Sequence, residues 1–223
     1  LILGLTAMIC LAKLPYTHLR KAAYGGLAVS AILLIALFIP GLGAKVGGAR
    51  RWLRLGVLSF QVSEFVKVCL VIFLAHFLAK KADRVKEWRI FVPPLLIVGI
   101  LAGLVLKQPD FGTAVLMVGL MLFLLYLAGC RLLHLGILFA AFIPAAVFLV
   151  WQKSYRLARW KTFLDPWQDP QKSGFQIIQS FLSFGSGGAF GVGLGDGMQK
   201  LFYLPEPHTD FILSIIGEET GLI

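Results

Sequence analysis

The chain has 223 residues, of which 58% are hydrophobic and 14% are charged, and its mean hydropathy is +0.84. Because soluble domains carry about 25% charged residues, this composition excludes an ordinary soluble enzyme or binding module. The formal net charge is +10, but the basic residues flank apolar runs, which indicates anionic lipid and not nucleic acid as their partner.

Apolar runs recur along the whole chain, which excludes a signal peptide followed by a soluble domain. Each run of about 20 residues predicts a helix, because lipid offers the backbone no other hydrogen-bonding partner. The expected fold is an all-α polytopic membrane protein, a single integral membrane domain over residues 1–223. In chain order the predicted spans are 1–12, 22–42, 63–79, 90–106, 111–130, 132–152 and 210–223, and residues 153–209 form a large extracytoplasmic loop.

Lysine and arginine counts predict the orientation of these spans. The loops at 13–21 and 80–89 and the turn at Arg131 carry nine such residues, whereas the short loops on the other side carry five. The positive-inside rule counts short loops and therefore places the first set in the cytoplasm. A count over all loops, nine against eleven, favours the opposite orientation weakly.

The stretch "GGARRWLRLG" at 47–56 places three arginines and Trp52 on the outer side, where positive charge is disfavoured. One interpretation is an interfacial anchor, in which the arginines extend to the lipid headgroups. The other is an anion site at Arg51 and its neighbours, because a planar guanidinium suits phosphate. The sequence leaves both open.

Ionisable residues inside the predicted span 63–79 are candidates for function. Glu64 and Lys67 are three residues apart, so they share a helix face and can pair. We expect the pair to be buried in the helix bundle, where it either fixes helix contacts or serves the reaction. His76 is expected to be a packed or hydrogen-bonded core histidine.

Two further features belong to the next spans. Gly99 and Gly103 are four residues apart, which predicts a close helix contact. Asp110 lies at a span end and is expected to be a helix N-cap that accepts a hydrogen bond from the amide of Gly112 or Thr113.

The long outer segment contains apolar residues at helical spacing over 175–184, which predicts an amphipathic helix on the membrane surface. Seven glycines follow between 185 and 197. They lack a G-x-G-x-x-G in register and a preceding strand, so tight re-entrant turns are favoured over a phosphate-binding loop.

The stretch "YLPEPHTD" at 203–210 leads into an apolar helix that is predicted to begin at Phe211. Capping by Thr209 or Asp210 explains the residue types. A functional carboxylate at Asp210, with His208 beside it, is the alternative, and both roles are compatible.

Several stretches together resemble the SEDS family of shape, elongation, division and sporulation proteins (FtsW/RodA/SpoVE), and the resemblance covers essentially the whole chain. "DPWQDP" (165–170) and "QKLFYLP" (199–205) look more like the division branch. Val62 departs from the family, which usually has proline there. The family has ten spans, so the chain looks like a window cut from a longer protein. The other matching stretches are "GGARRWLRLG", "FQVSEFVK", "KQPDFGTAVL", "FLDPWQDPQKSGFQIIQS", "GSGGAFGVGLGDGMQK" and "PEPHTDFILSIIGEETGL".

The resemblance implies a peptidoglycan glycosyltransferase that polymerises lipid II, with inversion at the anomeric carbon and undecaprenyl pyrophosphate as the leaving group. It implies the cytoplasmic membrane of a bacterium, an extracytoplasmic active face, and partnership with a class B penicillin-binding protein and other divisome proteins. A lipid II flippase, an elongation-type RodA paralogue and a scaffold are the alternatives.

The resemblance also assigns residues. It carries the family's essential outer aspartate onto Asp210, the expected catalytic base, and the paired intramembrane charges onto Glu64 and Lys67. No resident cofactor is evident, and a divalent cation, Mg²⁺ or Mn²⁺, is left open for the departing pyrophosphate. The residues expected to bind substrate or to support the site are Arg51, Trp52, Glu64, Lys67, Asp110, Lys200 and His208.

Overall fold

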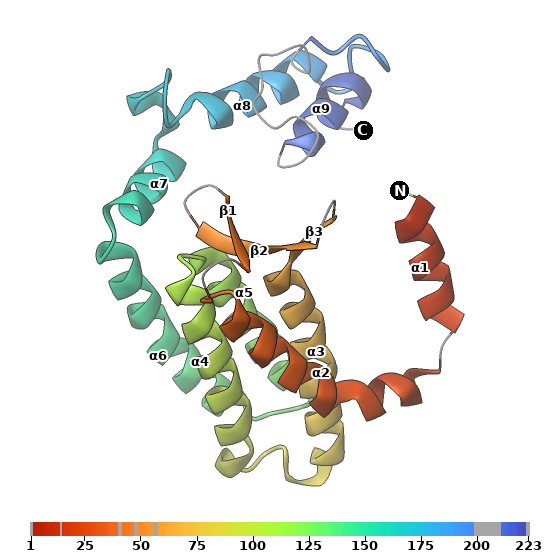
Figure 1. The fold of residues 1–223 in the computed structure, drawn as a ribbon. Helices are drawn as coiled ribbons and strands as arrows, with labels where there is room; N and C mark the ends of the chain where they lie inside the picture. Colours follow the sequence, from red (N-terminus) through yellow and green to blue (C-terminus); the bar gives the residue numbers. More distant parts are fainter. Residues whose placement is uncertain are drawn as a thin grey trace. The chain divides into compact units, whose positions relative to one another are not determined.

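The computed structural model describes residues 2–13, 15–39, 42–46, 49–55, 58–198 and 211–221. The chain divides into two compact units, Leu1–Ile143 and Pro144–Ile223. Helices dominate both units, and the first also contains a small sheet (Figure 1).

Helices form most of the first unit, as the apolar runs predict. Among the described residues, four helical segments are long and apolar enough to cross a membrane: Tyr16–Ala36, Val62–Lys80, Trp88–Lys107 and Leu132–Trp151. The expected helical membrane architecture is therefore confirmed. The helices are α1 (Ile2–Lys13), α2 (Tyr16–Ala36), α3 (Val62–Lys80), α4 (Val92–Lys107), α5 (Phe111–Leu127) and α6 (Leu132–Trp151), with short 3₁₀ turns at Ala82–Arg84 and Trp88–Ile90.

Helix α2 differs in its bounds from the predicted span 22–42. It begins at Tyr16, directly after Pro15, whose φ of −60° suits a helix start. The helix includes the polar stretch 17–21, which precedes its apolar part. This is possible because a helix requires backbone hydrogen bonds and not a hydrophobic sequence. At its other end the helix stops at Ala36, and the chain becomes extended from Gly43.

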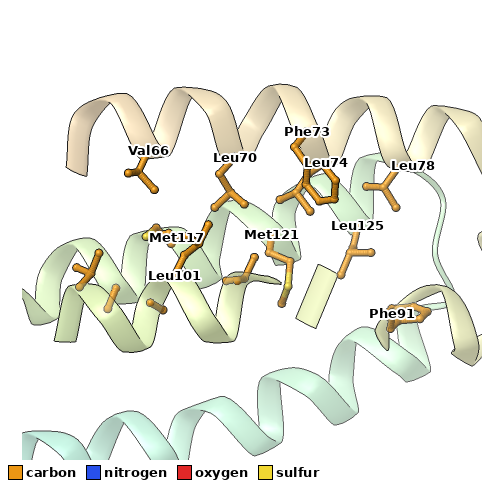
Figure 2. Packing of buried hydrophobic residues seen from close by; sticks show 14 of the residues in the cluster. Val66, Leu70, Phe73, Leu74, Leu78, Phe91, Leu101, Met117, Met121 and Leu125 are labelled. Carbon is orange, nitrogen blue, oxygen red and sulfur yellow. The ribbon is translucent and has the colours of Figure 1, made fainter. Parts of the chain in front are cut away.

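The core of the first unit lies between α3, α4 and α5 (Figure 2). On α5 the buried residues recur every three or four positions and so form one face of the helix. Figure 2 shows Met117, Met121 and Leu125 of this face among the buried side chains of α3 and α4. The largest buried side chains of α3 and α5 are Leu70, Phe73, Leu74, Met117, Met121 and Leu125.

A three-stranded antiparallel sheet accompanies the helices, and the sequence did not predict it. It comprises β1 (Gly43–Val46), β2 (Ala49–Leu55) and β3 (Leu58–Gln61), in the order β1-β2-β3. Trp52 pairs with Ala44 on one side and Gln61 on the other. In Figure 1 the sheet lies across the ends of α3 and α5. The stretch that reads as a loop thus places Arg51 on a strand.

The glycines of α4 do not make the close contact expected of them. A Cβ added at Gly99 or Gly103 meets no atom of the described residues within 4 Å. Helix α4 instead buries a face that carries Val98, Leu101 and Val105. Spacing identifies residues that share a face, but it does not reveal which face a neighbouring helix covers.

The second unit begins within α6 at Pro144 and also holds α7 (Ser154–Leu164), a 3₁₀ turn at Pro166–Gln168, α8 (Phe175–Gly187) and α9 (Ile212–Thr220). The predicted amphipathic helix over 175–184 is confirmed as α8. Its position on a membrane surface stays a prediction.

Candidate functional site

The turn between α4 and α5 joins three parts of the first unit. Buried Gln108 donates from Nε2 to the carbonyl oxygen of Leu34 on α2, at 3.2 Å. Arg51 on β2 donates from Nη2 to the carbonyl oxygen of Pro109, at 2.7 Å. The sheet, α2 and the start of α5 are therefore tied to one turn.

Asp110 performs two tasks at this turn. Its Oδ1 accepts a hydrogen bond from the amide of Thr113 at 3.2 Å, which confirms the predicted N-cap. Its Oδ2 lies 3.6 Å from Nε of Arg51, and the Asp110 side chain is only 10% exposed. We call this group of contacts between Arg51, Pro109 and Asp110 the arginine latch.

The latch bears on both interpretations of Arg51. Its side chain is 33% exposed as a whole, although Nε itself is buried beside the nearly buried carboxylate of Asp110. The carboxylate offsets part of the positive charge, and the hydrogen bond from Nη2 to the carbonyl oxygen of Pro109 orients the guanidinium. Contacts within the protein thus hold the Arg51 side chain in place.

Trp52 is the next residue on β2, and its side chain is half-buried. The register of β1 and β2 shifts here: Ala44 pairs with Trp52 and Lys45 with Arg50, so Arg51 is the extra residue of a β-bulge. Arg51 thus occupies an irregular position of the strand, whereas Trp52 has a partner on both neighbouring strands.

Glu64 and Lys67 pair as predicted, with 2.8 Å between Oε1 and Nζ. The prediction that the pair is buried is wrong for the described chain, because the Glu64 side chain is 58% exposed and that of Lys67 is 21% exposed. The face of α3 that packs inward carries residues such as Ser63 and Val66. The pair lies at the edge of that face.

His76 packs as expected. Its ring stands edge-on to that of Tyr24, with 5.5 Å between the centroids. Its Nδ1 is buried and has no hydrogen-bond partner among the described residues. His76 also lines a cavity of about 360 Å³ beside Tyr16 and Arg20.

In the second unit, the glycine-rich segment 188–198 folds back onto α9. Four of its glycines have positive φ: Gly188 (54°), Gly191 (75°), Gly193 (115°) and Gly195 (91°). Such angles favour glycine because it lacks a Cβ. The prediction of tight turns is therefore confirmed, and we refer to residues 188–198 as the glycine loop.

Close backbone contacts hold the glycine loop and α8 against α9. A Cβ added at Gly187 would collide with the backbone oxygen of Gly217, and one at Gly191 would collide with that of Glu219. The amides of Val192 and Gly193 donate to the carbonyl oxygens of Glu218 and Glu219, at 3.0 and 3.1 Å.

Glu218 is a candidate that the sequence analysis did not identify. It is only 3% exposed, and its Oε1 accepts a hydrogen bond from the amide of Met198 at 3.0 Å. The signal in the sequence was the acidic pair that ends an otherwise apolar helix, because such a residue is rarely buried without a specific partner.

Three of the predicted site residues, Lys200, His208 and Asp210, lie outside the described residues. Helix α9 begins at Ile212 and its N-cap position is Phe211, one residue after Asp210. The choice between cap and base for Asp210 stays a prediction. In the described ranges no three His, Cys, Asp or Glu side chains group to hold a metal ion.

Known proteins resemble this chain over its whole length. The FTSW_RODA_SPOVE family model, described as "Cell cycle protein", matches residues 1–223. A "Probable peptidoglycan glycosyltransferase FtsW" of Trichlorobacter lovleyi is 46% identical, over 100% of this chain and 58% of that protein. A protein of the same name in Coxiella burnetii is 44% identical, over 99% of this chain and 60% of its own length.

Solved structures agree with these matches. One, from work titled "Structural coordination of polymerization and crosslinking by a peptidoglycan synthase complex", has a TM-score of 0.71 and 31% identity, covering 98% of this chain and 60% of that one. A mutant of the Thermus thermophilus rod shape determining protein RodA has a TM-score of 0.60 and 25% identity, covering 99% and 56%.

The chain spans about 60% of the length of the curated relatives that it matches. The family match covers every residue, and the helical fold agrees with that of the solved relatives. This chain belongs to the FtsW/RodA/SpoVE family of multi-pass bacterial membrane proteins.

Proposed function

We propose that the protein to which this chain belongs is a peptidoglycan glycosyltransferase of the FtsW type, which polymerises lipid II into glycan strands during cell division. The observation that carries this proposal is the match over 100% of the chain, at 46% identity, to a relative with that printed name. The stretch around Asp210 lies inside the match. The division branch is favoured over the elongation branch because the two relatives described above carry the name FtsW.

The proposed reaction is a single displacement at the anomeric carbon of the donor sugar. The 4-hydroxyl of the acceptor sugar attacks, the bond to the pyrophosphate breaks, and undecaprenyl pyrophosphate leaves with the electron pair. Asp210 takes the hydroxyl proton, as a carboxylate within hydrogen-bond reach of that group can do. One displacement converts an α-linked donor into a β-linked product, so no covalent glycosyl intermediate is needed.

Arg51 is the proposed contact for a lipid-linked phosphate. It is oriented in advance by Asp110 and by the carbonyl oxygen of Pro109, and a third of its side chain is exposed. A preoriented cation stabilises a departing negative charge without a cost of reorganisation. Supporting roles are proposed for Trp52, Lys67, Lys200 and His208. Comparing the rate in EDTA with the rate in added Mg²⁺ or Mn²⁺ measures any contribution of a divalent ion.

The proposed setting is the cytoplasmic membrane, with the reaction at its outer face and a class B penicillin-binding protein as the partner that cross-links the strands. The peptidoglycan synthase complex among the solved relatives supports this choice of partner. Lipid II is anchored in the membrane, so its polymerase must act at the membrane surface. Other divisome proteins are further proposed partners.

Asp210→Asn in the full-length protein tests the proposal. The amide keeps the size of the side chain and its capping ability, but it is a very poor proton acceptor. We expect polymerisation of purified lipid II to slow by about 10²–10⁴-fold, the usual contribution of a general base, with unchanged thermal unfolding. The assay omits any glycosyltransferase other than the protein itself.

The same reconstituted system distinguishes the alternatives. Polymer formed at the parental rate by Asp210→Asn would leave Asp210 as a helix cap. Translocation of labelled lipid II without polymer would identify a flippase, and neither activity would indicate a scaffold.

A further inference from the structure

We propose that Glu218 is a positioning residue, which fixes the end of the glycine loop to α9 through its buried carboxylate. The inference rests on the proposed function for its catalytic consequence, because α9 is the helix that Asp210 precedes in the sequence. Its structural part stands independently on contacts in the second unit.

The burial of Glu218 requires a reason. A carboxylate that is 3% exposed loses most of its hydration, which is unfavourable unless hydrogen bonds replace the water. The amide of Met198 supplies one such bond, at 3.0 Å from Oε1. A carboxylate that accepts from a backbone amide makes a stronger bond than a neutral acceptor does.

The glycine loop requires specific contacts if it is to stay ordered. Glycine has the largest backbone freedom of all residues, so a loop with four positive-φ glycines loses much conformational entropy when it is ordered. The start of the loop is fixed by backbone bonds from Val192 and Gly193 to α9. The Glu218 side chain adds a bond at the end of the loop, so a change of this residue should loosen the end more than the part held by Val192 and Gly193.

The location of this bond in the chain gives it a functional consequence. Met198 is the last described residue before 199–210, and Phe211 begins the approach to α9 after that segment. Met198 and Phe211 flank the segment that contains Lys200 and Asp210. Met198 is joined to α9 by its hydrogen bond to Glu218, and Phe211 directly precedes α9 in the chain. Misplacing a reacting group by about 1 Å can reduce a rate about 10²-fold. A fixed flank therefore favours a reproducible position for the catalytic carboxylate.

The test compares three variants of the full-length protein. Glu218→Ala removes the acceptor, Glu218→Gln keeps a neutral amide oxygen of similar reach, and Thr220→Val is the matched control on the same turn. The hydroxyl of Thr220 donates to Ile216 within α9, and its loss leaves the Met198 bond intact.

Hydrogen–deuterium exchange tests whether Glu218 holds the glycine loop, and this measurement does not require the protein to be enzymatically active. Peptides that cover 192–198 should exchange at least about 10-fold faster in Glu218→Ala, by an intermediate amount in Glu218→Gln, and at the parental rate in Thr220→Val. Unchanged exchange in both Glu218 variants would overturn the proposal. Because Glu218→Gln preserves the shape of the side chain, it gives the decisive result if the alanine variant does not fold.

The rate of lipid II polymerisation tests whether Glu218 also affects catalysis. We expect kcat to fall about 10–100-fold in Glu218→Ala with KM within about twofold of the parent, and to recover partly in Glu218→Gln. Faster exchange with an unchanged kcat would reduce Glu218 to a purely structural residue. If the parent does not polymerise lipid II, the proposed function fails, while the exchange data still decide whether Glu218 fastens the loop.

Discussion

The two units of this molecule pack their helices in different ways. In the first unit, large side chains such as Phe73, Met117 and Met121 fill the space between helices. In the second unit, α8, the glycine loop and α9 touch through their backbones, at positions such as Gly187 and Gly217.

The difference indicates where each unit tolerates change. Side chains adopt other rotamers to absorb a small change in volume, whereas two backbones in contact cannot separate without moving whole elements. The second unit should therefore respond more strongly than the first to the addition of a single methyl group.

Gly187→Ala should give the largest effect of the substitutions that test this comparison. The added Cβ would meet the backbone of Gly217 and Glu218, so we expect a loss of about 3 kcal/mol, the upper part of the usual overpacking range. Unfolding of the full-length protein in detergent measures it.

Gly185→Ala is the matched control on the same helix. A Cβ at Gly185 meets nothing within 4 Å, and alanine favours a helix over glycine by about 1 kcal/mol. Equal destabilisation by both substitutions would contradict the backbone contact and remove the contrast between the units.

Asp110→Ala should rank second, because the first unit loses a cap and the partner of Arg51 at once. Loss of a cap costs about 1 kcal/mol, and the nearly buried ion pair adds to it, for a total of about 2 kcal/mol. Asp110→Asn should recover the cap alone. Thermal unfolding that is identical for the two variants would show that the arginine latch contributes nothing.

Lys67→Met should give the smallest effect. An exposed i,i+3 pair contributes about 0.2–0.5 kcal/mol, and Glu64 is more than half exposed. The stability difference should disappear in about 1 M salt, which screens such pairs. A loss above about 2 kcal/mol would restore the buried pair that the sequence suggested.

Local patterns predicted the parts of this fold that depend on neighbours in the sequence. The period of apolar residues identified α8, and the position of Asp110 before an apolar run identified its cap. The pairing of Glu64 with Lys67 followed from their spacing. Each of these needs information from a single helix only.

Contacts between distant residues were not predicted. Arg51 meets Asp110 across 59 positions of sequence, and the sheet that presents Arg51 read as a loop because its strands are short. Gly99 and Gly187 illustrate the same limit, because only the folded backbone reveals that the first faces open space and the second touches another helix.

The bond between Gln108 and the carbonyl oxygen of Leu34 has a consequence for reading related sequences. Every residue has a main-chain carbonyl, so any buried side chain of suitable size at position 34 leaves this bond possible. Correlated substitution between positions 34 and 108 should therefore be weak even though the residues are in contact. Contact maps inferred from covariation will tend to miss this link between α2 and the turn, and they should detect the pair at 51 and 110 more readily.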